Sequence, residues 1–344
     1  MRFPVTEHVV KSDGHTTWYL ACGAPSAPLI VFVHGWPELS ISWRHQLRCF
    51  ADLGFRAVAP DMRGYGGSTV HLRLEDYAME PIVGDLLALL RALGREQAVW
   101  VGHDWGAPAV WSLAQHHPER ALAVASLCVP YQPRGFTVDN LIPTVNRERY
   151  PLDEYPAGQW DYQLFYRENF DKARATFEAN PLNTAKALFR KGNPDLRNTP
   201  ARTATVRRDG GWFGGAAEAP DVPVDRDLLT DEDLHRYASS LARNGFFGPG
   251  AWYMNGDANA AYARRARNEG RLDMPVLFLH ASRDYTCDTT DAPLLVAPMR
   301  EACRDLTEAT LPTGHWMAQE RPELVNANLA RWLAAKLPQY WRTS

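Results

Sequence analysis

The sequence of 344 residues lacks the features that mark membrane, secreted and nucleic-acid-binding proteins. No run approaches the roughly 18 apolar residues of a membrane span, and residues 1–7 lack the apolar stretch of a signal peptide. A formal net charge of −3 provides no basic excess for nucleic acid or an anionic membrane. The five cysteines are scattered without a C-x-x-C pair, which favours reduced thiols. We therefore expect a cytoplasmic protein without nucleic-acid or membrane partners, either a monomer or a homodimer.

Motifs for cofactors and metals are also missing. The sequence contains no H-E-x-x-H, no Cys/His pattern with metal-ligand spacing and no G-x-G-x-x-G phosphate loop. Hydrophobic residues make up 45% and charged residues 22%, which is ordinary for a globular protein. We expect no metal and no organic cofactor, so side chains of this protein should carry out any reaction by themselves.

Short apolar runs alternate with helical patterns through much of the chain. The first part opens with a hairpin pattern at residues 7–22 around Asp13-Gly14, a favoured turn pair. Apolar runs of strand type then follow at residues 29–33, 56–59, 97–101, 121–129, 275–279 and, weakly, 306–311. Helical patterns occupy residues 77–93 and 322–337. This alternation predicts an α/β fold with a mostly parallel sheet that helices cover on both faces.

Residues from about 130 to 267 interrupt that pattern. They contain no clear strand runs, are rich in aromatic residues, Arg and Asn, and are typical of short helices joined by loops. We therefore expect an α/β core in two parts, residues 1–131 and 268–344, with a helical cap at residues 132–267. The cap is expected over the carboxyl edge of the sheet, where ligand sites of such sheets lie.

The pentapeptide Gly102-His103-Asp104-Trp105-Gly106 stands between a strand run and a helical pattern. It has the form G-x-nucleophile-x-G of the nucleophile elbow, a tight turn that needs its two glycines. Esterases carry serine at the middle position, whereas this chain has Asp104. A carboxylate attacks saturated carbon, so it opens a strained ring or displaces a halide and forms an alkyl ester.

The partners of an elbow nucleophile follow in the order acid and then histidine. Asp284 lies in the loop after the strand run at residues 275–279, and His315 follows the last weak strand run. His315 would deprotonate a water molecule, and Asp284 would orient the imidazole ring and stabilise its cation. Asp288 is an alternative acid, but Asp284 is nearer to the end of the strand.

The loop after the first core strand run is His34-Gly35-Trp36-Pro37. In elbow enzymes this loop supplies one backbone N–H of the oxyanion hole, and the residue after the nucleophile supplies the other. We therefore expect the N–H groups of Trp36 and Trp105 to stabilise an oxyanion while water attacks the ester. His34 and His103 are expected to be structural.

Together these motifs resemble the α/β-hydrolase superfamily, and specifically its epoxide hydrolases. The resembling segments are His34–Pro37, residues 61–68 (Asp-Met-Arg-Gly-Tyr-Gly-Gly-Ser), the pentapeptide at 102–106 and Gly314-His315-Trp316, within a resemblance that spans residues 31–333. The resemblance also implies a cis Trp36–Pro37 bond. It further implies two cap tyrosines that protonate the epoxide oxygen, Tyr162 and Tyr253. Tyr166 is the alternative to Tyr162, since it lies four residues on and can share its helix face.

The resemblance implies an epoxide hydrolase acting on a small-molecule epoxide. Asp104 would form an alkyl ester, a tyrosine would protonate the leaving oxygen, and water activated by His315 would release a vicinal diol. Aromatic residues favour a hydrophobic or aryl epoxide. The expected substrate-binding residues are Trp36, Trp105, Phe165, Tyr166 and Trp252, and Trp212, Phe213 and Phe246 are further candidates for the pocket wall.

Two other functions remain as alternatives. A haloalkane dehalogenase shares the aspartate nucleophile, and Trp105 could donate a hydrogen bond to a halide. However, Trp36 stands where many dehalogenases carry asparagine, and paired tyrosines suit an alkoxide better than a halide, which needs no proton. Fluoroacetate dehalogenases, by resemblance, need an arginine where this chain has Trp105. A catalytically silent receptor or scaffold is disfavoured because every catalytic piece is present.

Overall fold

The computed structural model describes residues 3–341, and its strands form one eight-stranded sheet. The strands are β1 (Thr6–Ser12), β2 (His15–Cys22), β3 (Leu29–Val33), β4 (Arg56–Pro60), β5 (Ala98–His103), β6 (Ala121–Leu127), β7 (Leu272–Ala281) and β8 (Cys303–Leu311). Their spatial order is β1-β2-β4-β3-β5-β6-β7-β8. The pairs β1–β2 and β2–β4 are antiparallel, and all other neighbours are parallel. The predicted mostly parallel sheet is confirmed.

Burial explains why the strands differ in their sequence signal. All residues of the central strands β3 and β5 are buried, so their sequences are continuous apolar runs. In the edge strand β8 only the two end residues are buried, and all residues between them are exposed or partly buried. Charged residues therefore occupy its outer positions, and its apolar pattern is weak.

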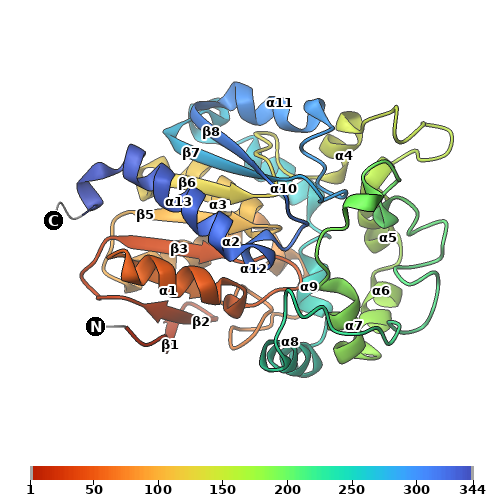
Figure 1. Cartoon of the computed structure of the whole chain (residues 1–344), viewed down its shortest axis with the longest axis horizontal. Coiled ribbons are helices and arrows are strands. Elements are labelled where there is room, and N and C mark those ends of the chain that lie inside the picture. Colours follow the sequence, from red (N-terminus) through yellow and green to blue (C-terminus); the bar gives the residue numbers. More distant parts are fainter. Residues whose placement is uncertain (1–2, 342–344) are drawn as a thin grey trace.

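Two layers of helices cover the sheet (Figure 1). The helices α1 (Arg44–Asp52) and α13 (Pro322–Lys336) contact each other on one face, and α2 (Met79–Ala92) contacts α3 (Gly106–His116) on the other. The helix α11 (Pro293–Ala302) connects β7 to β8, and the short α12 (Met317–Glu320) precedes α13. Among the described residues, no helix combines the length and the hydropathy needed to cross a membrane.

The segment between β6 and β7 is helical and has no strand among its residues, all of which the structure describes. Its helices are α4 (Val138–Leu141), α5 (Asp161–Glu168), α6 (Phe170–Glu178), α7 (Pro181–Leu188), α8 (Asp231–Asn244), α9 (Phe247–Ala251) and α10 (Gly256–Ala263). In Figure 1, α5, α6 and α7 lie on the right, beyond the arrowheads of the parallel strands, and α8 lies at the bottom beside α7. The last helix, α10, instead packs against α2 of the core. The loops at the carboxyl edge of the sheet therefore face a helical layer.

Candidate active site

Asp104 occupies the turn between β5 and α3. Its backbone has φ of +47°, in the left-handed region that residues with side chains rarely adopt. A Cβ on Gly106 would lie 2.1 Å from the carbonyl oxygen of Val33, and one on Gly102 would lie 2.5 Å from the Gly106 carbonyl oxygen. Both positions therefore require glycine, and the tight turn brings the Asp104 carboxylate to the carboxyl edge of the sheet.

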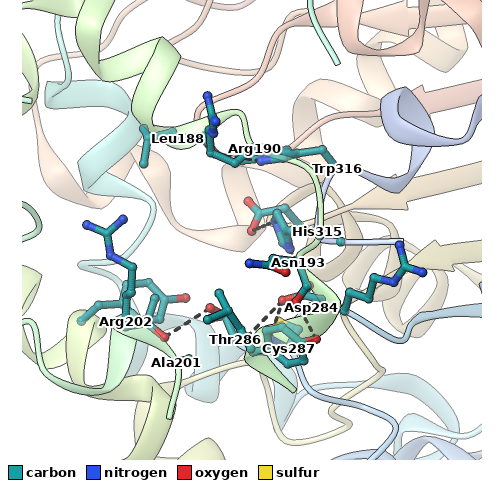
Figure 2. A pocket seen from close by; sticks show the side chains of 18 of the residues that line it. Leu188, Arg190, Asn193, Ala201, Arg202, Asp284, Thr286, Cys287, His315 and Trp316 are labelled. Atoms are coloured by element: carbon teal, nitrogen blue, oxygen red, sulfur yellow. Dashed lines mark hydrogen bonds and ion pairs between the residues drawn. The ribbon is translucent and has the colours of Figure 1, made fainter. Parts of the chain in front are cut away.

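His315 lies between two carboxylates. Its Nδ1 is 2.6 Å from Oδ2 of Asp284, and its Nε2 is 3.4 Å from Oδ2 of Asp104. The other oxygen of Asp284 accepts hydrogen bonds from the backbone N–H groups of Thr286 and Cys287, at 3.1 and 3.0 Å (Figure 2). These bonds fix the Asp284 carboxylate, which in turn fixes the orientation of the imidazole ring.

The alternative acid, Asp288, has other partners. Its carboxylate pairs with Arg149 and accepts hydrogen bonds from the Thr290 hydroxyl and the Asp291 N–H group. Asp284 is therefore the carboxylate that the structure brings to His315.

The charges of this group stabilise one another. Burial alone would lower the pKa of His315, but the carboxylates of Asp284 and Asp104 raise this pKa well above its ordinary value. Burial alone would raise the pKa of Asp284, but His315 holds it below its ordinary value. At neutral pH the resting site therefore contains an imidazolium between two carboxylates.

The loop after β3 reaches the second oxygen of the nucleophile. The Trp36 N–H group donates a hydrogen bond of 2.5 Å to Oδ1 of Asp104, and the Trp36–Pro37 bond is cis, as the resemblance implied. A Cβ on Gly35 would lie 2.4 Å from both this oxygen and the Trp105 nitrogen. Glycine at position 35 therefore lets the loop approach the carboxylate, beside the two backbone nitrogens expected to form the oxyanion hole.

The two histidines expected to be structural are both buried and hydrogen-bonded. His34 donates from Nδ1 to the Gly35 carbonyl oxygen and accepts from the Met62 N–H group at Nε2, each at 2.9 Å. Its own loop and the loop after β4 are thereby joined. Burial lowers the pKa of His34, so this histidine is neutral.

His103 belongs to a buried ion pair that the sequence analysis missed. Its Nδ1 lies 2.7 Å from Oε2 of Glu38, and its Nε2 lies 2.8 Å from the backbone oxygen of His315. Burial alone would lower the pKa of His103, but Glu38, together with the Cys128 thiol, raises it to about 10. The ring is therefore doubly protonated and donates to both partners. The signal available in the sequence was only a glutamate directly after His34–Pro37, in a segment expected to be buried.

A cavity of about 390 Å³ opens onto the triad (Figure 2). Asp104, His315, Tyr162 and Tyr253 all line it, together with the rings of Trp36, Trp212 and Trp316. Tyr162 comes from α5, and Tyr253 lies just beyond α9. Their ring centres are 5.7 Å apart. The structure therefore brings both expected tyrosines to the same cavity as the nucleophile.

Tyr166 has a different environment. Its ring stacks on Tyr253 at 4.5 Å, but it is not part of the cavity wall. Its hydroxyl group is buried without a hydrogen-bond partner among the described residues. Tyr166 therefore packs against Tyr253 outside the cavity wall, and the geometry favours Tyr162 over Tyr166 as the first acid.

The two cavity tyrosines are suited to donate protons. Burial raises the pKa of both Tyr162 and Tyr253, and the nearby Asp104 raises each pKa further. Both phenols therefore stay protonated at neutral pH. The Tyr162 oxygen accepts a hydrogen bond from Gln163 Nε2 at 3.3 Å, which leaves its own proton free to be donated.

The structure distributes the expected substrate-binding residues unevenly. Trp36 lines the cavity, whereas Trp105, Phe165 and Trp252 are buried outside its wall. The Trp105 ring packs edge-on against Tyr253 at 5.0 Å and thus supports a wall residue. Much of the remaining wall comes from residues 188–203, which sequence reasoning did not single out because this stretch carries no motif or periodicity.

One group of possible metal ligands lies beside the triad. Ligand atoms of His103, Cys128 and His315 all lie within 4.8 Å of one another. However, His103 Nε2 and the Cys128 thiol both donate to the His315 carbonyl oxygen, and the His315 ring faces the two aspartates. These atoms therefore have protein partners, and we assign them to positioning His315.

Comparisons with known proteins agree with this geometry. Residues 28–322 match the family described as alpha/beta hydrolase fold. The chain is 34% identical over 333 residues to epoxide hydrolase A of Mycobacterium tuberculosis, across 95% of this chain and 97% of that protein. It is also 34% identical over 311 residues to bifunctional epoxide hydrolase 2 of Sus scrofa, across 90% of this chain. The chain spans about half of the length of the pig protein (52%).

Solved structures give the same result. Epoxide hydrolase A from Mycobacterium thermoresistibile has a TM-score of 0.78 and 32% sequence identity, covering 96% of this chain and 98% of that one. An epoxide hydrolase from Vigna radiata has a TM-score of 0.76 and 26% identity, again covering 96% and 98%. The likeness extends through both the sheet and the helical segment.

Proposed function

The chain belongs to the epoxide hydrolases, a family of hydrolytic enzymes with the α/β-hydrolase fold that act on epoxides, and we propose that it works through a covalent alkyl ester on Asp104. The observation that carries this proposal is that the two carboxylate oxygens of Asp104 have different surroundings. Oδ1 accepts the Trp36 N–H group, and Oδ2 faces His315 beside the cavity. One oxygen is thus held where a carbonyl oxygen would need donors, and the other is left to attack.

In the first step, Oδ2 of Asp104 attacks a ring carbon of the epoxide. The carbon–oxygen bond of the ring breaks, and its electron pair goes to the epoxide oxygen. A proton from Tyr162 or Tyr253 passes to that oxygen, since an alkoxide is a poor leaving group at neutral pH. The raised pKa of both tyrosines supports this role, because each phenol holds its proton until an alkoxide develops nearby.

In the second step, His315 acts as the base. Esterification removes the negative charge of Asp104, which is one cause of the raised pKa of His315. We infer that this pKa then falls, so His315 releases its proton, which restores the hydroxyl group of the tyrosine that acted as the acid, and can activate a water molecule. Water attacks the ester carbon, and the N–H groups of Trp36 and Trp105 stabilise the oxyanion on Oδ1. The acyl–oxygen bond breaks, the leaving alkoxide takes the proton that His315 removed from water, and a vicinal diol leaves. The proton of the resulting Asp104 carboxylic acid then passes to His315, which restores the resting site.

The cavity wall supports a preference for hydrophobic or aryl epoxides. The rings of Trp36, Trp212 and Trp316 provide apolar surface close to the triad. Phe165, Tyr166 and Trp252 would then act indirectly, by supporting the wall. We propose that residues 132–267 form the cap that closes the site, over a core made of residues 1–131 and 268–344.

Trapping the ester tests the mechanism. His315→Gln should react with styrene oxide and gain the mass of one epoxide on Asp104, because the ester forms and is not hydrolysed. Asp104→Asn should gain no mass, and wild type should release the diol. His235→Gln, which changes an exposed histidine on α8, is the control and should turn over like wild type. Absence of the adduct from His315→Gln, although wild type makes diol, would rule out the ester route.

A haloalkane panel separates the remaining alternatives. The Trp105 ring lies outside the cavity wall, so the halide donor that a dehalogenase needs is not provided there. We expect diol from epoxides and no halide release from chloroalkanes or bromoalkanes. Halide release without diol would instead favour the dehalogenase, and no turnover of either class would favour the silent receptor or scaffold.

A further inference from the structure

The charged residues of the cavity wall are mostly positive. Besides the triad, the wall contains Arg190, Lys191, Arg202 and Arg283. The carboxylates among the lining residues are those of Asp104 and Asp284, and both face His315. This excess of positive charge runs against the chain as a whole, whose formal net charge is −3. The cavity therefore has a local positive character that the overall composition does not predict.

Three of these cations lack a carboxylate partner within the described part of the chain. Lys191 pairs with Asp227. In contrast, Arg190 donates to a backbone carbonyl oxygen, that of Pro223 at 2.6 Å, and the guanidinium groups of Arg202 and Arg283 make no ion pair with any residue that the structure describes. Most other arginines in the described residues have acidic partners; Arg197, for example, lies 3.5 Å from Asp291. Three guanidinium groups without a carboxylate partner in residues 3–341 thus belong to the wall of the cavity that holds the triad.

Two of the three arginines belong to the solvent-exposed part of the cavity wall. Arg190 and Arg202 are exposed, and Arg283 is partly buried. In Figure 2, Arg190 lies on the side of Leu188 and Arg202 on the side of Ala201, while His315 and Asp284 lie nearer the middle of the group. The apolar rings of Trp36 and Trp212 also line the cavity. One cavity therefore combines an apolar wall, a reactive carboxylate and a cationic rim.

We propose that the epoxide hydrolysed here carries a carboxylate group that binds the arginines of this rim. The inference rests on the proposed function and names its substrate class. A guanidinium group has the planar fork of donors that matches a carboxylate, and a lysine lacks this geometry. The triad at rest holds two carboxylates and one imidazolium, so it repels an anion placed next to it. A substrate anion is favoured only away from Asp104, and the rim provides that position.

The size of the cavity limits the substrate. Ligand cavities span about 300–1,000 Å³, so a volume of about 390 Å³ lies near the lower end of this range. A compact aryl epoxide with the carboxylate on the far side of the ring fits this description. The matched probes are 4-(oxiran-2-yl)benzoate, its neutral methyl ester and unsubstituted styrene oxide.

The test compares kcat/KM for the anion with kcat/KM for the methyl ester. We expect wild type to favour the anion by about tenfold at low ionic strength, chiefly through KM, with the preference falling as salt screens the exposed arginines. Arg202→Gln, Arg283→Gln and Arg190→Gln should each reduce the preference by about two- to fivefold, and the triple variant should abolish it. Arg304→Gln removes an equal charge from a side chain that is 82% exposed and outside the cavity wall, and it should leave the preference unchanged.

Turnover of styrene oxide distinguishes a failure of the rim proposal from a failure of the proposed function. A circular dichroism spectrum and a Tm that match wild type show that the triple variant is folded, and diol formation from styrene oxide by wild type and by Arg304→Gln measures the basal activity. If the anion preference is absent in wild type or persists in the triple variant, the rim proposal is wrong while the proposed function stands.

Binding of the product gives a readout that does not depend on turnover. Calorimetric titration with 4-(1,2-dihydroxyethyl)benzoate should show binding to wild type that weakens at least tenfold in the triple variant. The corresponding neutral amide should bind both proteins equally. Equal binding of the acid to both proteins would overturn the proposal even if no epoxide were turned over.

Discussion

Replacing Glu38 with glutamine tests the buried ion pair beneath the triad. Glu38 Oε2 accepts hydrogen bonds from the Gly35 N–H group at 3.1 Å and from His103 at 2.7 Å. A glutamine amide can place its oxygen or its nitrogen at that point. If the amide oxygen replaces Oε2, neutral His103 donates its one ring proton to that oxygen. The carbonyl oxygen of His315 then loses the hydrogen bond from the His103 ring. With the nitrogen there, the amide and the Gly35 N–H group face each other as two donors.

The structure also sets the size of the stability loss expected for Glu38→Gln. The ordinary pKa of histidine is 6.5, and Glu38, with a contribution from Cys128, raises the pKa of His103 to about 10. At about 1.4 kcal/mol for each factor of ten, this difference corresponds to at most about 5 kcal/mol. Breaking a buried pair costs about 3–5 kcal/mol, and the glutamine retains one hydrogen bond, so we expect a loss of about 3 kcal/mol. With an unfolding entropy of about 2.1 cal/mol/K per residue, Tm should fall by about 4 °C.

The stability that the Glu38–His103 pair contributes depends on pH in a defined direction. The pKa of His103 is raised on folding, so its stabilisation is complete below pH 6.5 and is lost as pH rises through about 10. His103 lowers the pKa of Glu38 from 4.5 to about 2. The stabilisation contributed by Glu38 is therefore complete above pH 4.5 and is lost as pH falls through about 2. The difference in stability between wild type and Glu38→Gln should therefore be largest between pH 4.5 and 6.5, and it should shrink toward pH 10.

Thermal unfolding followed by circular dichroism from pH 5 to pH 10.5 measures this difference. Glu301→Gln, which changes an exposed glutamate on α11, is the control and should unfold like wild type. A Tm for Glu38→Gln within 1 °C of wild type at pH 6 would refute the reasoning, because the pair would then contribute about nothing. A difference that is the same at pH 6 and pH 10.5 would refute the assigned protonation of His103.

Three further predictions concern the acids, the elbow and the base. Tyr162→Phe and Tyr253→Phe should each lower kcat at least tenfold, since general acids contribute about 10²–10⁴-fold; Tyr166→Phe should change kcat less than about threefold and raise Tm, because it removes a buried hydroxyl group without a partner. Equal losses in all three variants would contradict the assignment. Gly106→Ala should yield no folded protein, since its Cβ would meet a carbonyl oxygen at 2.1 Å, whereas Gly84→Ala on α2 meets nothing within 4 Å and should fold; circular dichroism decides. In single-turnover stopped-flow, ester hydrolysis should accelerate as pH rises through the pKa of the triad histidine, because only the neutral imidazole is a base; a rate that fell with rising pH would exclude that role.

The fold was predictable where burial on both faces produced continuous apolar runs. The strands β3, β5 and β6 were located within two residues at each end, because nearly every residue in them is buried. The helices α1 and α11 were not predicted. The helix α1 opens with Arg44-His45-Gln46, and its buried apolar residues are few. The helix α11 contains Pro298 in its interior, a residue that normally argues against a helix.

The site was predictable where the backbone dictates residue type. The elbow glycines meet neighbouring backbone in the turn, so the motif is visible in sequence. The choice between Tyr162 and Tyr166 could not be made there, because residues four apart share a helix face. How α5 packs against the residues that follow α9 decides which ring reaches the cavity. The rim arginines gave no signal either. Their proposed role depends on the lack of carboxylate partners around them, and this lack is visible only in the folded structure.

The triad and the cavity wall are held by different forces, and this difference predicts how the enzyme can change. Asp284 and Asp104 accept backbone hydrogen bonds at 3.1 Å or less, so the reacting groups have little freedom. The tyrosines and tryptophans of the wall are positioned mainly by ring packing at 5–6 Å, which adapts to substitution more readily than fixed hydrogen bonds. Substitutions in the wall should therefore alter substrate preference while preserving the order of chemical steps. Changes around Asp104 should instead lower activity toward every substrate alike.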